Sequence, residues 1–171
     1  GNQGETMKLE SLPAESTARA LIEFMHGLSL ETVPAKIVDS AKWAVLDSLG
    51  CAIFGSQQPW AKIMADEMLA ERSHGRASII GRSETLAAPA AALCNGTATH
   101  GFELDDFIDE GTVHPGAVIL PAVLAAAESV DAPGSRFLLG IIAGYEMMNR
   151  VGAAIGVEPS RRGHHQTALA G

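Results

Sequence analysis

Apolar residues recur at the spacing of an α-helix along almost the whole of this 171-residue chain. Between Glu15 and Met25, apolar side chains follow the i, i+3, i+4, i+7 rule that places them on one helix face. The same pattern predicts further helices over residues 34–55, 60–71, 86–99, 117–130 and 133–155. Only residues 77–80, bounded by two glycines, form a short run that favours extended backbone. The predicted fold class is all-α, a helical bundle with no internal domain boundary.

The second of these helices shows most clearly how the pattern works. Pro34 suits the first turn of a helix, where a missing backbone N–H costs nothing. The apolar face that follows it ends at Gly55 and consists of Ile37, Val38, Ala41, Val45, Leu49 and Ala52. A face of this kind needs a partner, so the helix is expected to pack against the rest of the bundle.

Composition limits the partners. Apolar residues make up 47% of the chain, enough to bury one core, and the formal net charge is −8. No basic stripe interleaved with aromatic residues is present, which argues against nucleic acid. The longest apolar runs fall well short of the roughly 20 residues needed to cross a bilayer, so no membrane is expected either.

The N-terminus lacks the basic and apolar regions of a secretory signal, and a cytoplasmic location is predicted. Residues 1–6, ahead of Met7, are interpreted as an expression remnant, which leaves 7–171 as the domain. Cys51 and Cys94 stand in apolar surroundings, where a thiol usually behaves as a small core residue. Neither cysteine is predicted to be a nucleophile.

Ionisable side chains are most concentrated between His100 and Gly116, in the segment HGFELDDFIDEGTVHPG. Two histidines and five carboxylates lie there between alanine-rich apolar segments. Charged groups packed between core-forming helices must face water or line a cavity, because an unpaired buried charge is costly. A helix, a polar loop and a second helix form the simplest arrangement, with the loop as the candidate site.

The six histidines differ in how strongly they point to a function. His26 and His74 are expected to be solvated. His100, at the end of a helix, has a simple alternative role as a partner of the helix dipole. His114 and His165 each lie in a polar loop just before an apolar helix start, and they are the stronger candidates. Histidine beside carboxylates suits proton transfer near neutral pH.

Two other chemistries compete for these residues. No pair of histidines has helix-face spacing and no cysteine cluster exists, so no metal site is predicted. The run Asp105-Asp106-Phe107-Ile108-Asp109 also matches the DDxxD motif by which all-α prenyl-diphosphate synthases hold magnesium and a diphosphate. Gly111 and Pro115 are expected to break the helix that such a motif requires. A third alternative is a non-catalytic helical interaction module.

Several sequence blocks together resemble the MmgE/PrpD family, which includes 2-methylcitrate dehydratases and cis-aconitate decarboxylases. The matching blocks run in the family's order and are LDSLGCAIFGS (46–56), Asn95-Gly96, His100, Asp105-Asp106, His114-Pro115 with the VILPAVLAAAE helix, and the tail from Gly163 through His164, His165, Gln166 and Thr167 to Gly171. Their order over nearly the whole chain is far more specific than any single block.

The resemblance implies a cofactor-independent lyase, a homodimer that acts on small di- or tricarboxylic acids, as in propionate metabolism. Members of the family are considerably longer and combine a helical domain with an inserted α+β lid. The chain is therefore expected to be an N-terminal portion of the helical domain, and an incomplete catalyst by itself.

The resemblance also implies roles for individual residues. His114 and His165 match the family's two active-site histidines, with His114 as the expected base and His165 as the acid or carboxylate-binding cation. Asp105 and Asp106 match its acidic pair and are expected to orient the site together with His100. Independently of the resemblance, recognition of a carboxylate needs positive charge, so Arg161, close to His165 in the sequence, is a candidate for substrate binding.

Two departures bear on the reaction. Decarboxylase-like members carry aspartate where Glu103 stands, which keeps Glu103 as a catalytic candidate, and threonine where Phe107 stands. The loop between Phe107 and His114 is also one residue longer here. Dehydration and decarboxylation therefore both remain open at this point.

Overall fold

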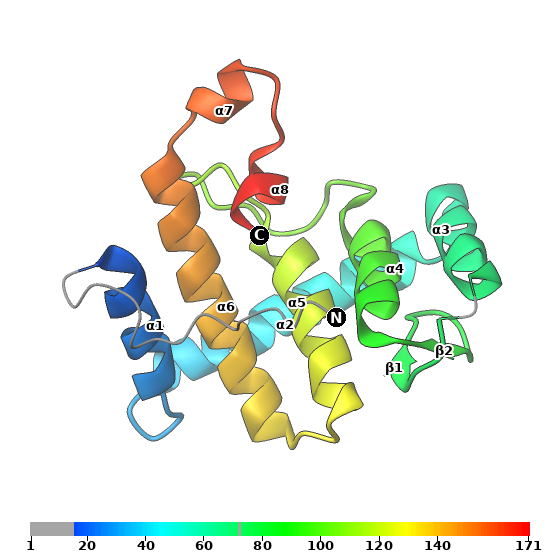
Figure 1. Ribbon diagram of the computed structural model, residues 1–171, viewed down its shortest axis with the longest axis horizontal. Helices are drawn as coiled ribbons and strands as arrows, with labels where there is room; N and C mark the ends of the chain where they lie inside the picture. Colours follow the sequence, from blue (N-terminus) through cyan, green and yellow to red (C-terminus); the bar gives the residue numbers. More distant parts are fainter. Residues whose placement is uncertain (1–15, 72) are drawn as a thin grey trace, which may run out of the picture.

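The computed structural model describes residues 16–71 and 73–171 and consists mainly of helices (Figure 1). The predicted remnant 1–6 and Glu15 lie outside the described residues. The elements are α1 Thr17–Gly27, α2 Ala35–Gly55, α3 Pro59–Ala70, β1 Ala77–Ser78, β2 Thr85–Leu86, α4 Ala88–His100, α5 Pro115–Ser129, α6 Gly134–Ile155, α7 Glu158–Arg161 and α8 Gln166–Ala170. The all-α prediction is confirmed.

Local chemistry explains where the helices begin and end. The Ser16 side chain accepts a hydrogen bond of 3.1 Å from the backbone N–H of Arg19 and caps α1. Proline occupies the first turn of α3, α4 and α5, where its missing N–H is harmless. The long helix α6 ends at Gly156, whose φ of 66° favours glycine. Each predicted helix is therefore present, with ends that shift by a few residues.

The prediction of one short extended run was incomplete, because β1 pairs with a second strand, β2. The two strands are antiparallel, with Ala77 opposite Leu86 and Ser78 opposite Thr85. Leu86, which was assigned to the start of a helix, instead lies in β2, and α4 begins two residues later. Leu86 is buried in the core there, so its apolar character fits either structure.

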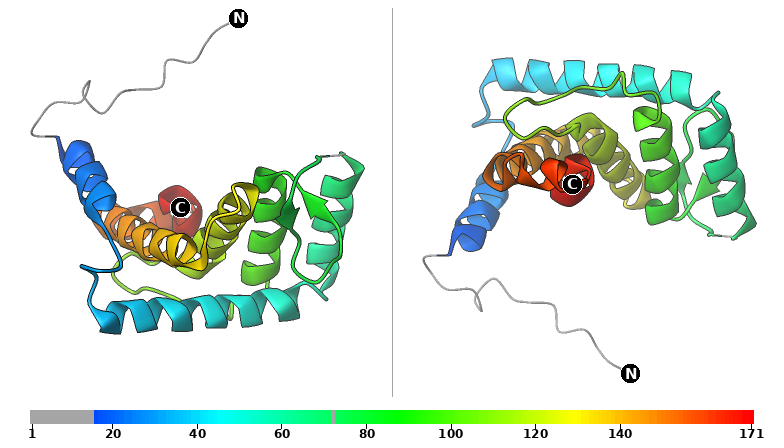
Figure 2. Two further views of the ribbon diagram at one scale, coloured as in Figure 1. Left: turned by 90° about the horizontal axis from the view of Figure 1, so that it is seen from below. Right: turned by 90° about the horizontal axis from the view of Figure 1, so that it is seen from above.

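α2 runs straight along one side of the molecule, and α4, α5 and α6 pack against it (Figures 1 and 2). One core cluster joins α3, the hairpin, α4 and α5 and consists of Ala65, Ala77, Ile79, Leu86, Ala90, Ala91, Cys94 and Ala125. The other joins α2, α5 and α6 through Ala41, Leu120, Ile141 and Ile142. Alanine predominates in these contacts, so the helix backbones approach one another closely.

The pair Asn95-Gly96, one of the blocks that resemble the family, has a structural role. The buried Asn95 amide accepts from the Ile80 N–H and donates to the Ser78 carbonyl, both at 2.8 Å, and so ties α4 to the hairpin. A Cβ at Gly96 would lie 3.1 Å from the Ala117 carbonyl oxygen in α5. Pro121 cannot donate to that carbonyl within the helix, and glycine leaves room for it.

One face of α2 is not covered by the bundle. Trp43, Leu46 and Ile53 lie at helical spacing on it and are 70%, 58% and 60% exposed. The predicted inner face is otherwise confirmed, with Ala41 and Ala52 buried, although Ile37 is exposed. None of the helices in residues 16–71 and 73–171 is both long and apolar enough to cross a membrane.

The crossing of α2 and α4 generates a stability prediction. A Cβ at Gly55 would come within 1.8 Å of the Ala98 carbonyl oxygen, so Gly55→Ala must push the helices apart. We expect a loss of about 1–3 kcal/mol in the free energy of unfolding, measured by urea denaturation. Gly50→Ala in the same helix meets nothing within 4 Å and should stabilise by about 0.5–1 kcal/mol. Equal effects at the two positions would contradict the close crossing.

Candidate active site

The loop between α4 and α5 folds back on itself and brings His114 to the end of α4. Glu103 and Thr112 adopt positive φ angles, both 51°, at its two turns. Across the second turn, the Ile108 N–H donates to the Val113 carbonyl at 2.9 Å, and the Val113 N–H donates to the Ile108 carbonyl at 3.3 Å. Residues 101–114 contain no helix. The predicted helix, polar loop and helix are therefore present, but the DDxxD carboxylates do not lie along a helix.

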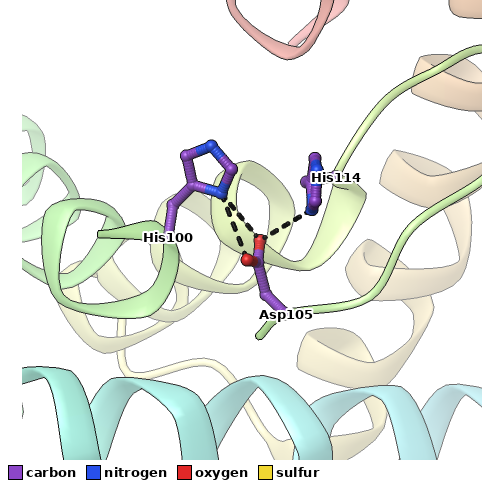
Figure 3. A group of neighbouring side chains, drawn as sticks. All are labelled: His100, Asp105 and His114. Carbon is purple, nitrogen blue, oxygen red and sulfur yellow. Dashed lines mark hydrogen bonds and ion pairs between the residues drawn. The ribbon is translucent and has the colours of Figure 1, made fainter. Parts of the chain in front are cut away.

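Asp105 lies between two of the predicted histidines, with its side chain fully buried (Figure 3). Its two carboxylate oxygens are each 3.1 Å from Nδ1 of His100, at the C-terminal end of α4. One of them is also 3.5 Å from Nδ1 of His114, the residue before α5. The imidazole rings are 4.7 Å apart between centroids. A single carboxylate therefore orients both rings.

His114 is held from two further directions. Its backbone N–H donates to Oγ1 of Thr167 in α8 at 3.0 Å. The ring of Phe107 lies 5.1 Å from its ring, between centroids. Its Nδ1 atom is buried and makes no hydrogen bond, although a carboxylate oxygen of Asp105 lies 3.5 Å away. His114 is thus fixed in place with one ring nitrogen incompletely paired.

His165 and Glu103 complete the cluster on its exposed side. The His165 ring meets the His100 ring edge to face, with centroids 5.3 Å apart. A ring nitrogen of each of these two histidines and a carboxylate oxygen of Glu103 lie within 4.8 Å of one another. His100 is therefore the central member of the group, in contact with both histidines that the sequence singled out.

Asp106, the neighbour of Asp105, faces the opposite way, into the bundle. It accepts hydrogen bonds from the Tyr145 hydroxyl at 2.7 Å and from the Gly116 N–H at 2.8 Å. Burial raises the pKa of the Asp106 carboxyl, and these two bonds oppose the rise. Burial and the nearby carboxylate raise the pKa of Tyr145 well above its usual range, so the hydroxyl stays a donor. Asp106 thereby anchors the first turn of α5, directly after His114.

Gln166 fastens the C-terminal segment to the same loop. Its buried side-chain amide donates to the carbonyl of Gly111 at 3.0 Å and also to the carbonyl of Gly156. The Ser160 hydroxyl donates to its side-chain oxygen at 2.5 Å. The next residue, Thr167, accepts from His114. These contacts place His165 against the cluster.

The remaining sequence candidates lie elsewhere. Arg161 is an exposed residue of α7 and pairs with Glu158 at 3.9 Å. Asp109 is exposed on the loop, and His26 and His74 are exposed far along the chain from the cluster. Sequence reasoning missed Tyr145 and Ser48. Tyr145 is the one tyrosine of the chain, and Ser48 is a buried hydroxyl on the inner face of α2.

The two cysteines have the environment predicted for them. Cys94 is buried in the core with α3 and α4, and Cys51 is half-buried in α2. Burial is the main cause that raises the pKa of each thiol, and for Cys51 the carboxylates of Asp47, Asp105 and Asp106 add to it. Both thiols therefore disfavour the reactive thiolate.

The fold and the cluster define a class, a helical domain that gathers histidines and carboxylates suited to acid–base chemistry. Residues 19–171 match the model of the MmgE/PrpD N-terminal domain, and the chain belongs to the MmgE/PrpD family.

Individual relatives agree with the family. The chain is 32% identical over 171 residues to the cis-aconitate decarboxylase-like protein oryM of Aspergillus oryzae. The matched region covers 95% of the chain and 35% of that protein. It is 29% identical to a cis-aconitate decarboxylase of Aspergillus terreus, over 96% of the chain and 36% of the enzyme. The human cis-aconitate decarboxylase is 28% identical, over 85% of the chain and 30% of the enzyme. The chain thus spans about a third of the length of these relatives.

The buried Tyr145–Asp106 bond generates a prediction. Tyr145→Phe removes a hydrogen bond to a carboxylate and leaves it less well solvated, so we expect a loss of about 1.5–3 kcal/mol in the free energy of unfolding. Urea denaturation measures the loss. Ser129→Ala, which removes an exposed hydroxyl bonded to its own helix, is the control and should change stability by less than about 0.5 kcal/mol. Similar losses in both variants would argue against an anchoring role for Tyr145.

The cysteine environments generate a second prediction. At pH 8, iodoacetamide should alkylate Cys51 and Cys94 several-fold more slowly than it alkylates free glutathione, because burial raises the pKa of both thiols. Mass spectrometry of the native protein over time measures both rates. In urea the two sites should react at similar, faster rates. Rapid modification of native Cys51 would contradict its assignment as an inert thiol.

Proposed function

We propose that the whole protein is a cofactor-independent lyase that acts on a small di- or tricarboxylic acid by histidine acid–base chemistry. The observation that carries the proposal is the convergence of His114 and His165 on His100, with the buried Asp105 against His100 and His114. Groups of this kind contribute about 100- to 10,000-fold to proton-transfer steps. The family and the names of the relatives support a lyase.

His114 is assigned as the base. Asp105 lies on the Nδ1 side of its ring, so a proton held on Nδ1 leaves the lone pair of Nε2 free to accept a proton. The gap of 3.5 Å to Asp105 is wider than a good hydrogen bond. Catalytic hydrogen bonds often shorten when substrate binds. Asp105 and Asp106 act by positioning, because a carboxylate aimed at an anionic substrate would repel it.

His165 is assigned as the acid or as the cation that binds a substrate carboxylate. It is exposed and meets the cluster through His100, so it faces the side from which substrate enters. Glu103 lies beside it and is the alternative acid or base. The two histidines therefore divide into an inner, fixed residue and an outer, accessible one.

The same groups serve either lyase reaction. In a dehydration, the base takes a proton from the carbon next to a carboxylate, and the acid protonates the departing hydroxyl to give water. In a decarboxylation, carbon dioxide leaves its bonding electron pair on the substrate, and the acid delivers a proton to carbon. We favour decarboxylation of a cis-aconitate-like acid, because the relatives are named for it.

Recognition of a di- or tricarboxylate also requires positive charge. In the described part of the chain, the polar and ring contacts of the cluster join histidines, carboxylates, Phe107 and Thr167, and none involves a lysine or arginine. We propose that cationic groups outside residues 16–171 supply part of the carboxylate binding. A homodimer, predicted from the family resemblance, is one way to bring such groups to the site.

Substitution of the two histidines tests the proposal in the whole protein. His114→Ala and His165→Ala should each lower turnover of cis-aconitate by about 100-fold or more, because each removes a proton-transfer group. Steady-state kinetics measures the loss, and circular dichroism checks the fold. His26→Ala and His74→Ala are matched controls on exposed sites and should keep full activity. A His114→Ala enzyme with near-normal turnover would move the base to Glu103.

Product analysis tests the reaction class. Nuclear magnetic resonance of reactions with cis-aconitate and with 2-methylcitrate should show loss of carbon dioxide from the first more readily than loss of water from the second. EDTA should leave the activity in place, because the proposed chemistry uses only protein groups. Loss of this activity on EDTA treatment, with recovery on magnesium, would contradict the cofactor-independent mechanism.

A further inference from the structure

We propose that His100, Asp105 and His114 also form a binding site for one borderline divalent cation, with Zn²⁺ as the best match, and that this ion acts as an inhibitor of the protein. One ligand atom from each residue lies within 4.8 Å of the other two. The sequence predicted no metal site because these residues lack helical spacing. The fold of the loop brings them together, as Figure 3 shows.

The distances between the ligand atoms fit a small tetrahedral ion. Zinc holds nitrogen and oxygen ligands at about 2.0–2.1 Å, which separates neighbouring ligand atoms by roughly 3.3 Å in a tetrahedron. The Asp105 carboxylate lies 3.1 Å from Nδ1 of His100 and 3.5 Å from Nδ1 of His114. These two values bracket the ideal separation between the carboxylate oxygen and each nitrogen, and the two histidine ligand atoms lie within 4.8 Å of each other.

An independent observation points to the same place. Nδ1 of His114 is buried and has no hydrogen-bond partner, although it faces a buried carboxylate. A buried polar atom without a partner is unusual and costs free energy. A metal ion between this nitrogen and Asp105 would satisfy both atoms at once. The site is therefore arranged for a bond that the protein groups alone do not complete.

The surrounding residues can complete the coordination. Glu103 and His165 lie on the exposed side of His100, with ligand atoms in a second group within 4.8 Å. A structural zinc site takes four ligands, and the fourth can come from one of these residues or from water. The exposed position of Glu103 and His165 also gives the ion a route from solvent.

The donor set selects among cations. Two imidazoles and one carboxylate suit zinc and neighbouring transition metals, whereas magnesium prefers oxygen ligands in octahedral geometry. The ion would bind to the Nδ1 atoms of His100 and His114, the same atoms that face Asp105 and orient the two rings. It would also add positive charge beside His165. Inhibition follows if these residues carry out proton transfer, and this part of the inference rests on the proposed function.

Calorimetry with ZnCl₂ alone tests the binding site. Titration of the whole protein should show one strong site, and MgCl₂ should give no comparable signal. Co²⁺ should bind at the same site with the visible absorption typical of tetrahedral coordination, and Zn²⁺ should displace it. Absence of a one-to-one Zn²⁺ signal would overturn the proposal.

Variants locate the ion. His100→Gln, His114→Gln and Asp105→Asn should each weaken Zn²⁺ binding by at least about 10-fold, since each removes a ligand. His26→Gln and His74→Gln, both exposed and outside the cluster, should bind as the original protein does. Circular dichroism identifies any variant that fails to fold. The two control substitutions are at exposed positions and should leave the fold unchanged. Unchanged binding in folded His100→Gln and His114→Gln would refute the assignment.

Enzyme assays separate this inference from the proposed function. If the whole protein is active on cis-aconitate, stoichiometric Zn²⁺ should abolish turnover and EDTA should restore it. Zinc binding at the three residues with undiminished turnover would refute the inhibitory role, and would also place proton transfer elsewhere. Inactivity on every acid tested, with zinc binding intact, would contradict the proposed function and leave the metal site standing.

Discussion

Two adjacent carboxylates of one loop, the buried Asp105 and the half-buried Asp106, determine how the rest of the site is built. A buried carboxylate is tolerated only when hydrogen bonds or opposite charges surround it. Asp105 meets this need with two imidazoles, and Asp106 meets it with Tyr145 and the first turn of α5. Because the two side chains make their contacts on opposite sides of the loop, one loop serves both the histidines and the bundle. The loop is therefore both a structural joint and the location of the proposed chemistry.

Most of the fold could be predicted from the sequence, because the helices are long and their apolar faces are periodic. Helix α2, with Pro34 before it and Gly55 at its end, lies where the pattern put it. The strand β2 could not be predicted in this way. Two residues carry no periodicity, and Leu86 would be buried in a helix or a strand alike. Its conformation depends on pairing with Ser78 and Ala77, which is information that no local pattern contains.

The site residues also fall into those that a sequence pattern reveals and those that only tertiary contacts reveal. The dense charge of the loop made His114, Asp105 and their neighbours visible, since so many polar groups between apolar helices need an explanation. Tyr145 could not be found by that criterion, because it stands alone in an apolar helix and acquires its role only when α6 packs beside the loop. Its hydroxyl was the available signal, since a buried tyrosine usually finds a partner. Arg161 shows the converse, as closeness in sequence to His165 did not bring it into contact with the cluster.

The anchoring of the loop by Gln166 and Thr167 has a consequence for the order in which the protein folds. Thr167 accepts from His114 across 53 positions of the chain, whereas His100 and Asp105 are five positions apart. Contacts between distant residues form late, because closing a long loop costs entropy before any bond is gained. Order around His114 therefore depends on contacts between distant parts of the chain, and we expect it to form after the pairing of His100 with Asp105.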